Sequence, residues 1–584
     1  MRARLLFPDR DFDVTADLPA ASDDLIRDLE LGAVLDAMAA GDKYLREIST
    51  RVLLTGLTDP ADIRYRQQIL ADCVARPEVI RQMYGIAVGA LADKQRAWGF
   101  WPSQRPTSIL SGAVGQLDVL IARLRELRQV ADEHLAAFAS PGLVTLLRSL
   151  RHDLDDEYFA ALSEHLRQLR FRGGQLISAQ LGRDNSGINY VLRSGGTRRG
   201  WRERVGIEPR SVYSFTIPPR DEAGGQALED LASRGINLVA NAAAQSADHV
   251  SSYFTMLRAE LGFYVGCLNL HDRLASRGQP VTFPDPAPWN PAVFGCADLR
   301  DVSLALRTRE VVGNDVDADG RPLVIITGAN SGGKSTFLRS AGQARLMMQA
   351  GMFVTARSLR ASVCERIFTH FIREEDADMV SGRLDEELKR MSVIVDQITP
   401  HSLVLFNESF AATNEREGSE IGRQVVRALL EADVRAFFVT HQFDFADGFR
   451  REQPDSTLFL RAPRQPDGRR TYKLVVADPL PTSYGHDIYH RIGGWRGGES
   501  PDDRLRADGS RPAGAQLSVR LADLAGQFQA QDAVREHEGL EPGAVRHVRV
   551  LFQVGQHPQR LGRVQIAERG VERCPSALRH RPGR

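Results

Sequence analysis

The sequence predicts two kinds of architecture in one chain: a mostly α-helical region followed by an α/β domain. Over 24–169, leucine, isoleucine, valine and alanine recur at i, i+3 and i+4, which is typical of helices that bury one face. The same pattern returns over 224–276. After a proline-rich run at 280–291, short apolar runs alternate with helical patterns, beginning with 304–312 and 323–327. Such alternation indicates a sheet of parallel strands joined by helices.

The changes of pattern divide the chain into four predicted parts. They are an N-terminal segment at 1–23, a mainly helical region at 24–279, an α/β domain at 280–494 and a tail at 495–584. The tail is rich in arginine, glycine, glutamine and proline, contains no lysine and has little consistent periodicity. A segment of this composition buries too little apolar surface to fold, so we predict that the arginine-rich tail is disordered.

The composition limits the class of protein. A length of 584 residues is enough for roughly two to four domains. Basic and acidic side chains number 75 each, so contact with nucleic acid would depend on local basic patches. The five cysteines lie far apart without a C-x-x-C pair, which argues against zinc and disulfides and favours a reducing compartment. With no secretory signal pattern and no apolar run of membrane-spanning length, we predict a cytoplasmic protein without a membrane partner.

The strongest functional signal is the stretch 323–339, which reads LVIITGANSGGKSTFLR. The run 323–327 predicts a buried strand, and 336–348 predicts a helix. Between them lies the pattern G-x-x-x-x-G-K-[ST], whose glycines let backbone N–H groups converge on phosphate oxygens at a helix N-terminus. The predicted nucleotide-binding residues are Gly328, Ala329, Asn330, Ser331, Gly332, Gly333, Lys334, Ser335 and Thr336.

Two further predicted strands end in polar residues that suit the same chemistry. The apolar run 402–406 is followed by Asn407 and Glu408, where an acidic pair usually holds Mg²⁺ and activates water. The run 436–440 is followed by His441, which could sense or orient a γ-phosphate. We therefore predict Glu408 and His441 as catalytic residues.

Two side chains in these stretches are predicted metal ligands. The Ser335 hydroxyl of the loop would ligate Mg²⁺, and the Asn407 carbonyl would assist it. Lys334 would reach the β- and γ-phosphates.

A basic segment allows two interpretations. Five arginines surround Trp201 and could contact a phosphate backbone: Arg193, Arg198, Arg199, Arg202 and Arg204. A solvated loop between strands explains the same residues, and the sequence favours the loop.

Together these stretches resemble the MutS family of DNA mismatch-repair ATPases, a branch of the ABC-type ATPases. The loop TGANSGGKST, with Asn330, resembles the phosphate loop of the family. The stretch 313–315 precedes the loop where the family carries a similar Asn-Asp, and further similar stretches follow in the family's order, at 349–356, 366–369, 381–383 and 439–441. Upstream, LLTGLTDP at 53–60 is similar to the start of the family's helical core. The resemblance covers roughly 25–492 and is strongest after 311.

The resemblance implies an ABC-type ATPase domain preceded by helical core and lever segments. It implies ATP and Mg²⁺ as cofactors, DNA as a partner, and a homodimer in which ATP lies between two subunits. The family's signature stretch matches 411–418. On this basis Thr413 and Asn414 would face the ATP of the partner subunit.

Several departures from the family pattern refine this prediction. The chain leaves no room for an N-terminal mismatch-reading domain, the family's Asp-Glu pair is Asn407-Glu408, and the trans-acting serine position holds Asn414. These traits resemble a short, divergent bacterial branch.

We predict an Mg-ATP-dependent, DNA-binding ATPase of repair or recombination. The alternatives are a chromosome-associated ABC-type ATPase and a nucleotide-gated clamp with little hydrolysis, neither of which reads mismatches.

Overall fold

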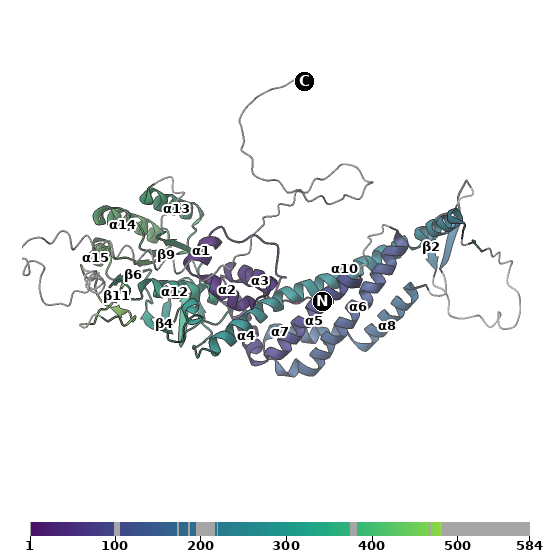
Figure 1. Ribbon diagram of the computed structural model, residues 1–584, viewed down its shortest axis with the longest axis horizontal. Helices are drawn as coiled ribbons and strands as arrows, with labels where there is room; N and C mark the ends of the chain where they lie inside the picture. The colour runs from purple at the N-terminus through teal and green to yellow at the C-terminus, as the bar shows by residue number, and fades with distance from the viewer. Residues whose placement is uncertain are drawn as a thin grey trace, which may run out of the picture. The chain divides into compact units, whose positions relative to one another are not determined.

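A computed structural model of the chain provides its fold (Figure 1). It describes residues 2–97, 105–171, 175–184, 187–193, 216–218, 220–373, 382–465 and 469–481. The predicted tail at 495–584 lies outside the described residues. The same is true of the end of the predicted α/β domain and of four of the five arginines beside Trp201, whereas Arg193 lies within the described residues.

The first part of the chain is helical, as predicted. Its helices are α1 (Ser22–Asp28), α2 (Leu31–Ala39), α3 (Lys43–Leu54), α4 (Pro60–Ala75), α5 (Pro77–Ala97), α6 (Pro106–His134), α7 (Pro141–Asp153), α8 (Asp156–Leu169) and α10 (Glu222–Ala275). Several begin at a side chain that accepts a free backbone N–H, which stabilises a helix N-terminus. Asp42 does so for α3, Asp59 for α4 and Asp155 for α8.

Helix α10 is the organising element of the helical part (Figure 1). Its 54 residues pack against α5 and α6 and, further along, against α2, α3 and α4. The hairpin of β1 (Leu176–Leu181) and β2 (Gly187–Arg193) also packs on it. Every residue over 259–268 is buried, whatever face of the helix it occupies. A helix that is buried on all sides is the centre of a core.

Helix α6 corrects one expectation from the sequence. The segment Pro106–Ala137 is long and apolar enough to cross a membrane by length and composition alone, whereas no such run was expected. In the structure α6 buries Leu117, Leu120, Leu124 and Leu127 among its neighbours. This burial within the bundle accounts for the apolar run, because a core helix has the same composition as a membrane span.

The second part of the chain contains two sheets. The larger has the order β12-β11-β6-β10-β9-β8, in which all neighbours are parallel except β12. Its strands are β6 (Leu323–Gly328), β8 (Ile367–Phe371), β9 (Leu403–Asn407), β10 (Arg435–Val439), β11 (Thr457–Ala462) and β12 (Val475–Val476). The smaller sheet has the order β3-β7-β4-β5, formed by β3 (Asp285–Ala287), β4 (Phe294–Leu299), β5 (Asn314–Asp317) and β7 (Ser358–Ser362).

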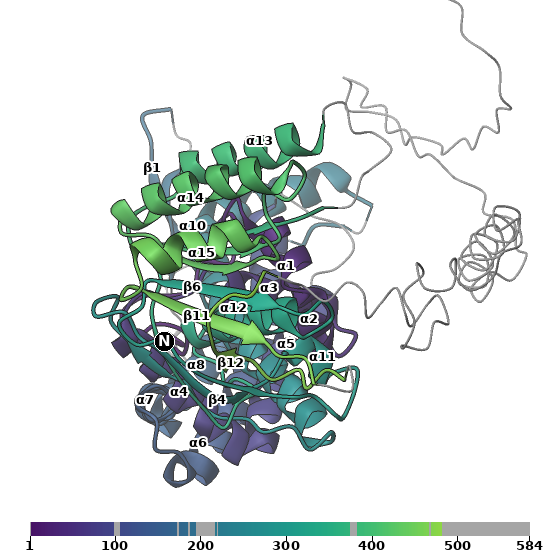
Figure 2. The same ribbon diagram turned by 90° about the vertical axis from the view of Figure 1, so that its left-hand side faces the viewer.

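Helices cover both faces of the larger sheet. One face carries α12 (Lys334–Gln349), and the other carries α13 (Arg383–Gln397), α14 (Glu415–Glu431) and α15 (Phe443–Glu452) (Figure 2). Alternate residues of the strands belong to two separate cores, as the period of two requires. On β6, Val324 and Ile326 join the core that continues into the helical part, whereas Leu323 and Ile325 face the other.

The start of this part differs from the sequence prediction. Residues 304–312 do not form a strand, and the first two of them belong to the short helix α11 (Val302–Ala305). The Asp301 side chain accepts the Leu304 N–H at 2.8 Å and fixes the first turn. One continuous hydrophobic core also joins α10 to α12. The domain boundaries predicted at 23, 279 and 494 stay predictions.

Candidate active site

The loop between β6 and α12 has the geometry that its glycines allow. Gly328 has φ +107°, and a Cβ at this position would lie 2.5 Å from the Ala462 carbonyl oxygen on the neighbouring strand β11. Gly333 has φ +92° and caps α12, which begins at Lys334. Only glycine adopts such angles without strain. The N-terminus of α12 therefore opens at the carboxyl end of β6, where backbone N–H groups favour an anion.

Lys334 is a buried cation at the start of α12, with only 6% of its surface exposed. Its Nζ donates to the carbonyl oxygens of Gly328 at 3.1 Å and Ala329 at 3.4 Å. The Glu408 carboxylate lies 3.9 Å away. Burial lowers the pKa of Lys334, and the charge of Glu408 opposes that change. A buried ammonium held mainly by carbonyls is suited to a phosphate, whose charge would compensate it.

Ser335 and Asn407 meet across the site. The Ser335 hydroxyl donates to Asn407 Oδ1 at 2.8 Å, which joins the first turn of α12 to the end of β9. Both side chains present oxygen atoms of the kind that Mg²⁺ binds. Over the described ranges of the chain, no cluster of three or more His, Cys, Asp or Glu residues could hold a metal by itself. This donor set fits a magnesium ion that takes its remaining ligands from phosphates and water.

Glu408 lies between Lys334 and His441. Its Oε2 accepts the His441 backbone N–H at 3.0 Å and lies 2.8 Å from His441 Nδ1. The hydrogen bond to Glu408 raises the pKa of His441. Burial opposes ionisation of Glu408, but its contacts with His441 and the charge of Lys334 outweigh burial and lower its pKa. The carboxylate is therefore ionised at neutral pH and able to accept a proton.

The structure thus assembles three of the predicted segments. The ends of β6, β9 and β10 are neighbours in one parallel sheet, so the residues that follow them converge on one edge. The remaining predicted residues lie between the end of β6 and the first turn of α12. Ser331 has φ +56° within it, and Thr336 lies half-buried in the first turn of α12.

Thr413 and Asn414 serve the start of α14 in this subunit. Asn414 Oδ1 accepts the Glu417 backbone N–H at 3.0 Å as the N-cap of the helix. The Thr413 hydroxyl donates to Glu417 Oε2 at 2.8 Å. Asn414 is exposed, so its outer face is open to a contact from outside the subunit.

Other residues beside the loop had no assigned role in the sequence. Arg470 Nε donates to the Asn330 carbonyl at 3.2 Å. Asn314 Oδ1 accepts the Leu474 N–H at 2.7 Å and holds the segment beside Gly333. Asn314 carried a signal, since it precedes the loop in a pattern that matches the family. Arg470 carried none, because arginines are frequent throughout this part of the chain.

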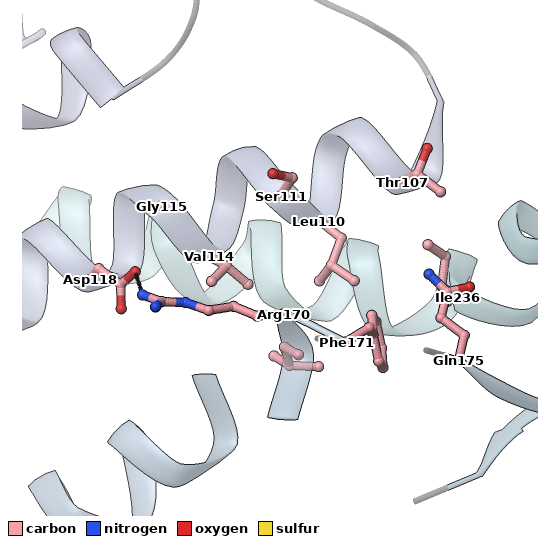
Figure 3. A pocket seen from close by; sticks show the side chains of 11 residues that line it. Thr107, Leu110, Ser111, Val114, Gly115, Asp118, Arg170, Phe171, Gln175 and Ile236 are labelled. Carbon is pink, nitrogen blue, oxygen red and sulfur yellow. Dashed lines mark hydrogen bonds and ion pairs between the residues drawn. The ribbon is translucent and has the colours of Figure 1, made fainter. Parts of the chain in front are cut away.

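A separate cavity of about 520 Å³ lies in the helical part (Figure 3). Leu110 and Val114 of α6 point toward the segment that follows α8, and Asp118 forms an ion pair with Arg170 at the edge (Figure 3). None of the lining residues belongs to the predicted site. We therefore assign it no role.

The fold and the site define a class of protein. A glycine-rich loop that joins a central parallel strand to a helix beginning with lysine is the signature of α/β proteins with a phosphate-binding loop. Comparison with known families narrows this class. Residues 58–277 match the MutS2 N-terminal domain, and residues 324–493 match MutS domain V. The chain belongs to the MutS family.

Individual relatives agree with this assignment. The DNA mismatch repair protein MutS of Chloroflexus aurantiacus is 33% identical over 222 residues, 37% of this chain and 21% of that protein. The endonuclease MutS2 of Thermus thermophilus is 30% identical over 206 residues, 35% of this chain and 26% of that protein. MutS of Thermus aquaticus is 32% identical over 183 residues, which are 31% of this chain and 22% of that protein. The chain thus spans about a fifth to a quarter of the length of these relatives.

Proposed function

We propose that the chain binds ATP with Mg²⁺ at this loop and hydrolyses it. The observation that carries the proposal is the convergence of Lys334, the Ser335–Asn407 pair and Glu408 at one edge of the larger sheet. Each element of an ATPase site is then represented by a side chain of suitable type. The family assignment supports the same activity, and we further assign the α/β part to the ABC-type ATPases.

In the proposed mechanism each residue has a defined task. The loop N–H groups and Lys334 would bind the phosphates, and Ser335 with Asn407 would hold Mg²⁺. Bound Mg²⁺ would neutralise charge on the phosphate oxygens. Glu408 would accept a proton from the attacking water, since it is ionised and lies 3.9 Å from Lys334, the proposed phosphate ligand. His441 orients Glu408 through its two hydrogen bonds, and it would contact the γ-phosphate of a bound nucleotide.

ATP hydrolysis is tested by comparing the wild-type chain with Lys334→Ala. We expect Mg-dependent release of phosphate by the wild type and loss of ATP binding in the variant, because a methyl group replaces the charged contact. Lys43→Ala, at an exposed position at the start of α3, serves as a control for loss of a lysine charge elsewhere. Equal ATP binding by wild type and Lys334→Ala would reject the site.

We also propose DNA as the partner of the helical part, acting in repair or recombination. The support is the family and the DNA mismatch repair proteins among the relatives, such as MutS of Thermus aquaticus. Contact through phosphates predicts that affinity falls steeply with salt and that a single mismatch is not preferred over homoduplex. Binding to homoduplex, mismatched, branched and single-stranded DNA at two salt concentrations, with and without ATP, tests this. Salt-insensitive binding, or a clear preference for the mismatch, would contradict it.

A second function is kept open by one residue. Asn407 places a neutral amide where an acid would add charge near Mg²⁺, which favours a nucleotide-gated clamp with little turnover. The two proposed functions differ in the rate of ATP hydrolysis. Nucleotide-dependent DNA binding without measurable phosphate release would establish the clamp.

A further inference from the structure

The backbone around Glu408 is held in an unfavourable conformation. Glu408 has φ +55° and Phe410 has φ +60°, on either side of Ser409. Residues with a Cβ pay a conformational cost in this left-handed region. Such backbone persists only where neighbouring groups fix it. The side chains that fix this turn therefore control the position of the Glu408 carboxylate.

One of these side chains is His370, next to the last residue of β8. It is fully buried, and its Nδ1 lies 2.7 Å from the Ser409 hydroxyl. Its Nε2 lies 3.0 Å from the Glu387 carbonyl oxygen, so it spans from the turn to α13. The imidazole also stacks on the Phe410 ring, with centroids 5.3 Å apart. His370 thus contacts both residues that follow Glu408.

The second side chain is Glu387 of α13. Its Oε2 accepts the Phe410 backbone N–H at 2.6 Å, inside the core. Glu387 occupies the face of α13 that also carries the buried Met391 and Ile394. At this position an apolar side chain would pack without the cost of burying a carboxylate. A carboxylate at this position accepts the Phe410 N–H, which would otherwise be buried without an acceptor at a cost in stability.

We propose that Glu387 and His370 are positioning residues, which hold the Glu408 carboxylate in place through Ser409 and Phe410. Neither residue touches the nucleotide site, and both act through the turn that follows β9. The Glu387 side chain accepts the Phe410 N–H, and the Glu387 carbonyl oxygen lies beside His370 Nε2. Both groups belong to α13, so the position of α13 determines whether the Glu408 carboxylate is aligned. The proposal rests on the proposed function only for its effect on hydrolysis.

A pair of substitutions at one position separates positioning from packing. Glu387→Met keeps the size of the side chain and removes the acceptor, whereas Glu387→Gln retains an oxygen for the Phe410 N–H. We expect Glu387→Met to lower kcat about tenfold or more at unchanged KM for ATP, with Glu387→Gln within about twofold of wild type. Asp396→Asn, on an exposed position of the same helix, is the control and should leave kcat unchanged.

Amide hydrogen exchange over 403–412 gives a second measurement that needs no hydrolysis. We expect Glu387→Met to accelerate exchange in this segment, while Glu387→Gln exchanges like the wild type. If Glu387→Met does not fold, His370→Phe replaces it. Phenylalanine keeps an aromatic ring beside Phe410 and removes the imidazole contacts with the Ser409 hydroxyl and the Glu387 carbonyl, while the Ser409 hydroxyl still donates to the backbone carbonyl of residue 370.

The outcomes are distinguishable from failure of the proposed function. Exchange rates and kcat equal to wild type in Glu387→Met would overturn the positioning role. Equal loss of kcat in Glu387→Met and Glu387→Gln would also overturn it, since the acceptor would then not matter. A wild-type chain without ATPase activity would reject the proposed function, while the exchange measurement would still decide whether Glu387 holds the turn.

Discussion

At the scale of single residues, the candidate site depends on a carboxylate that stays charged although it is buried. Burial alone would raise the pKa of Glu408, but the hydrogen bond to His441 and the charge of Lys334 reverse the direction. A general base must be ionised at the working pH. The neighbours of Glu408 therefore supply the protonation state that its proposed role requires.

Removing this charge gives the most direct prediction. Glu408→Gln keeps the shape of the side chain but cannot accept a proton from water. We expect ATP to bind with an affinity close to wild type while hydrolysis falls by about 100-fold or more. Nucleotide binding and single-turnover hydrolysis, measured on the same preparation, check both parts. Hydrolysis at the wild-type rate would show that Glu408 is not the base.

A second prediction concerns Asn407. The amide oxygen already accepts from Ser335 and can approach Mg²⁺, but an aspartate would add a negative charge. Asn407→Asp should therefore lower the Mg²⁺ concentration needed for half-maximal hydrolysis. Titrating Mg²⁺ against the ATPase rate for both proteins measures the effect. Superimposable curves would mean that position 407 does not approach the metal.

At the scale of elements, a buried carboxylate on α10 holds the N-terminal segment against the helical part. Glu260 is fully buried, and it accepts the Leu5 N–H at 2.5 Å and the Phe12 N–H at 3.4 Å. Tyr264, one turn further along α10, donates to the Leu5 carbonyl at 2.6 Å. Polar contacts thus fasten an irregular segment whose own backbone groups would otherwise be unsatisfied.

This contact predicts a pH dependence of stability. Burial raises the pKa of Glu260 from 4.5 to about 7, although the backbone hydrogen bonds oppose the change. The folded state therefore binds the proton more tightly than the unfolded state does. The contribution of Glu260 to the free energy of unfolding is complete below pH 4.5 and is lost as pH rises toward 7. The loss amounts to roughly 3 kcal/mol.

Glu260→Gln tests this prediction, because an amide does not titrate. Urea unfolding at pH 4.5, 6 and 7.5 should show a shallower decline in stability for the variant than for the wild type. Asp230→Asn, at an exposed position of the same helix, is a control that keeps the wild-type slope. Parallel pH profiles for wild type and Glu260→Gln would contradict the raised pKa.

At the scale of the whole molecule, the exposed start of α14 leads to a prediction about assembly. Thr413 and Asn414 make their described hydrogen bonds to Glu417. The proposed shared site would have them face the ATP of a partner subunit. ATP should therefore promote association of two chains. Sedimentation of the Glu408→Gln protein with and without Mg-ATP measures this without turnover. A monomer in both conditions would contradict the shared site.

The sequence determined the elements whose information is local. The loop at 328–336 could be predicted because glycines, lysine and serine at fixed spacing serve one geometry, and the long helix α10 could be predicted from its apolar period. Asn407, Glu408 and His441 could be placed together because the ends of parallel strands share one edge of a sheet.

Only the tertiary structure decided which distant residues support these elements. Nothing adjacent to Glu387 or His370 in the sequence indicates a contact with the turn after Glu408, and Glu260 reads as one charge among many on a helix. The apolar period identifies which face of a helix is buried, but it does not identify the backbone amide that the face meets. That amide belongs to a segment far along the chain, and packing alone brings the two together.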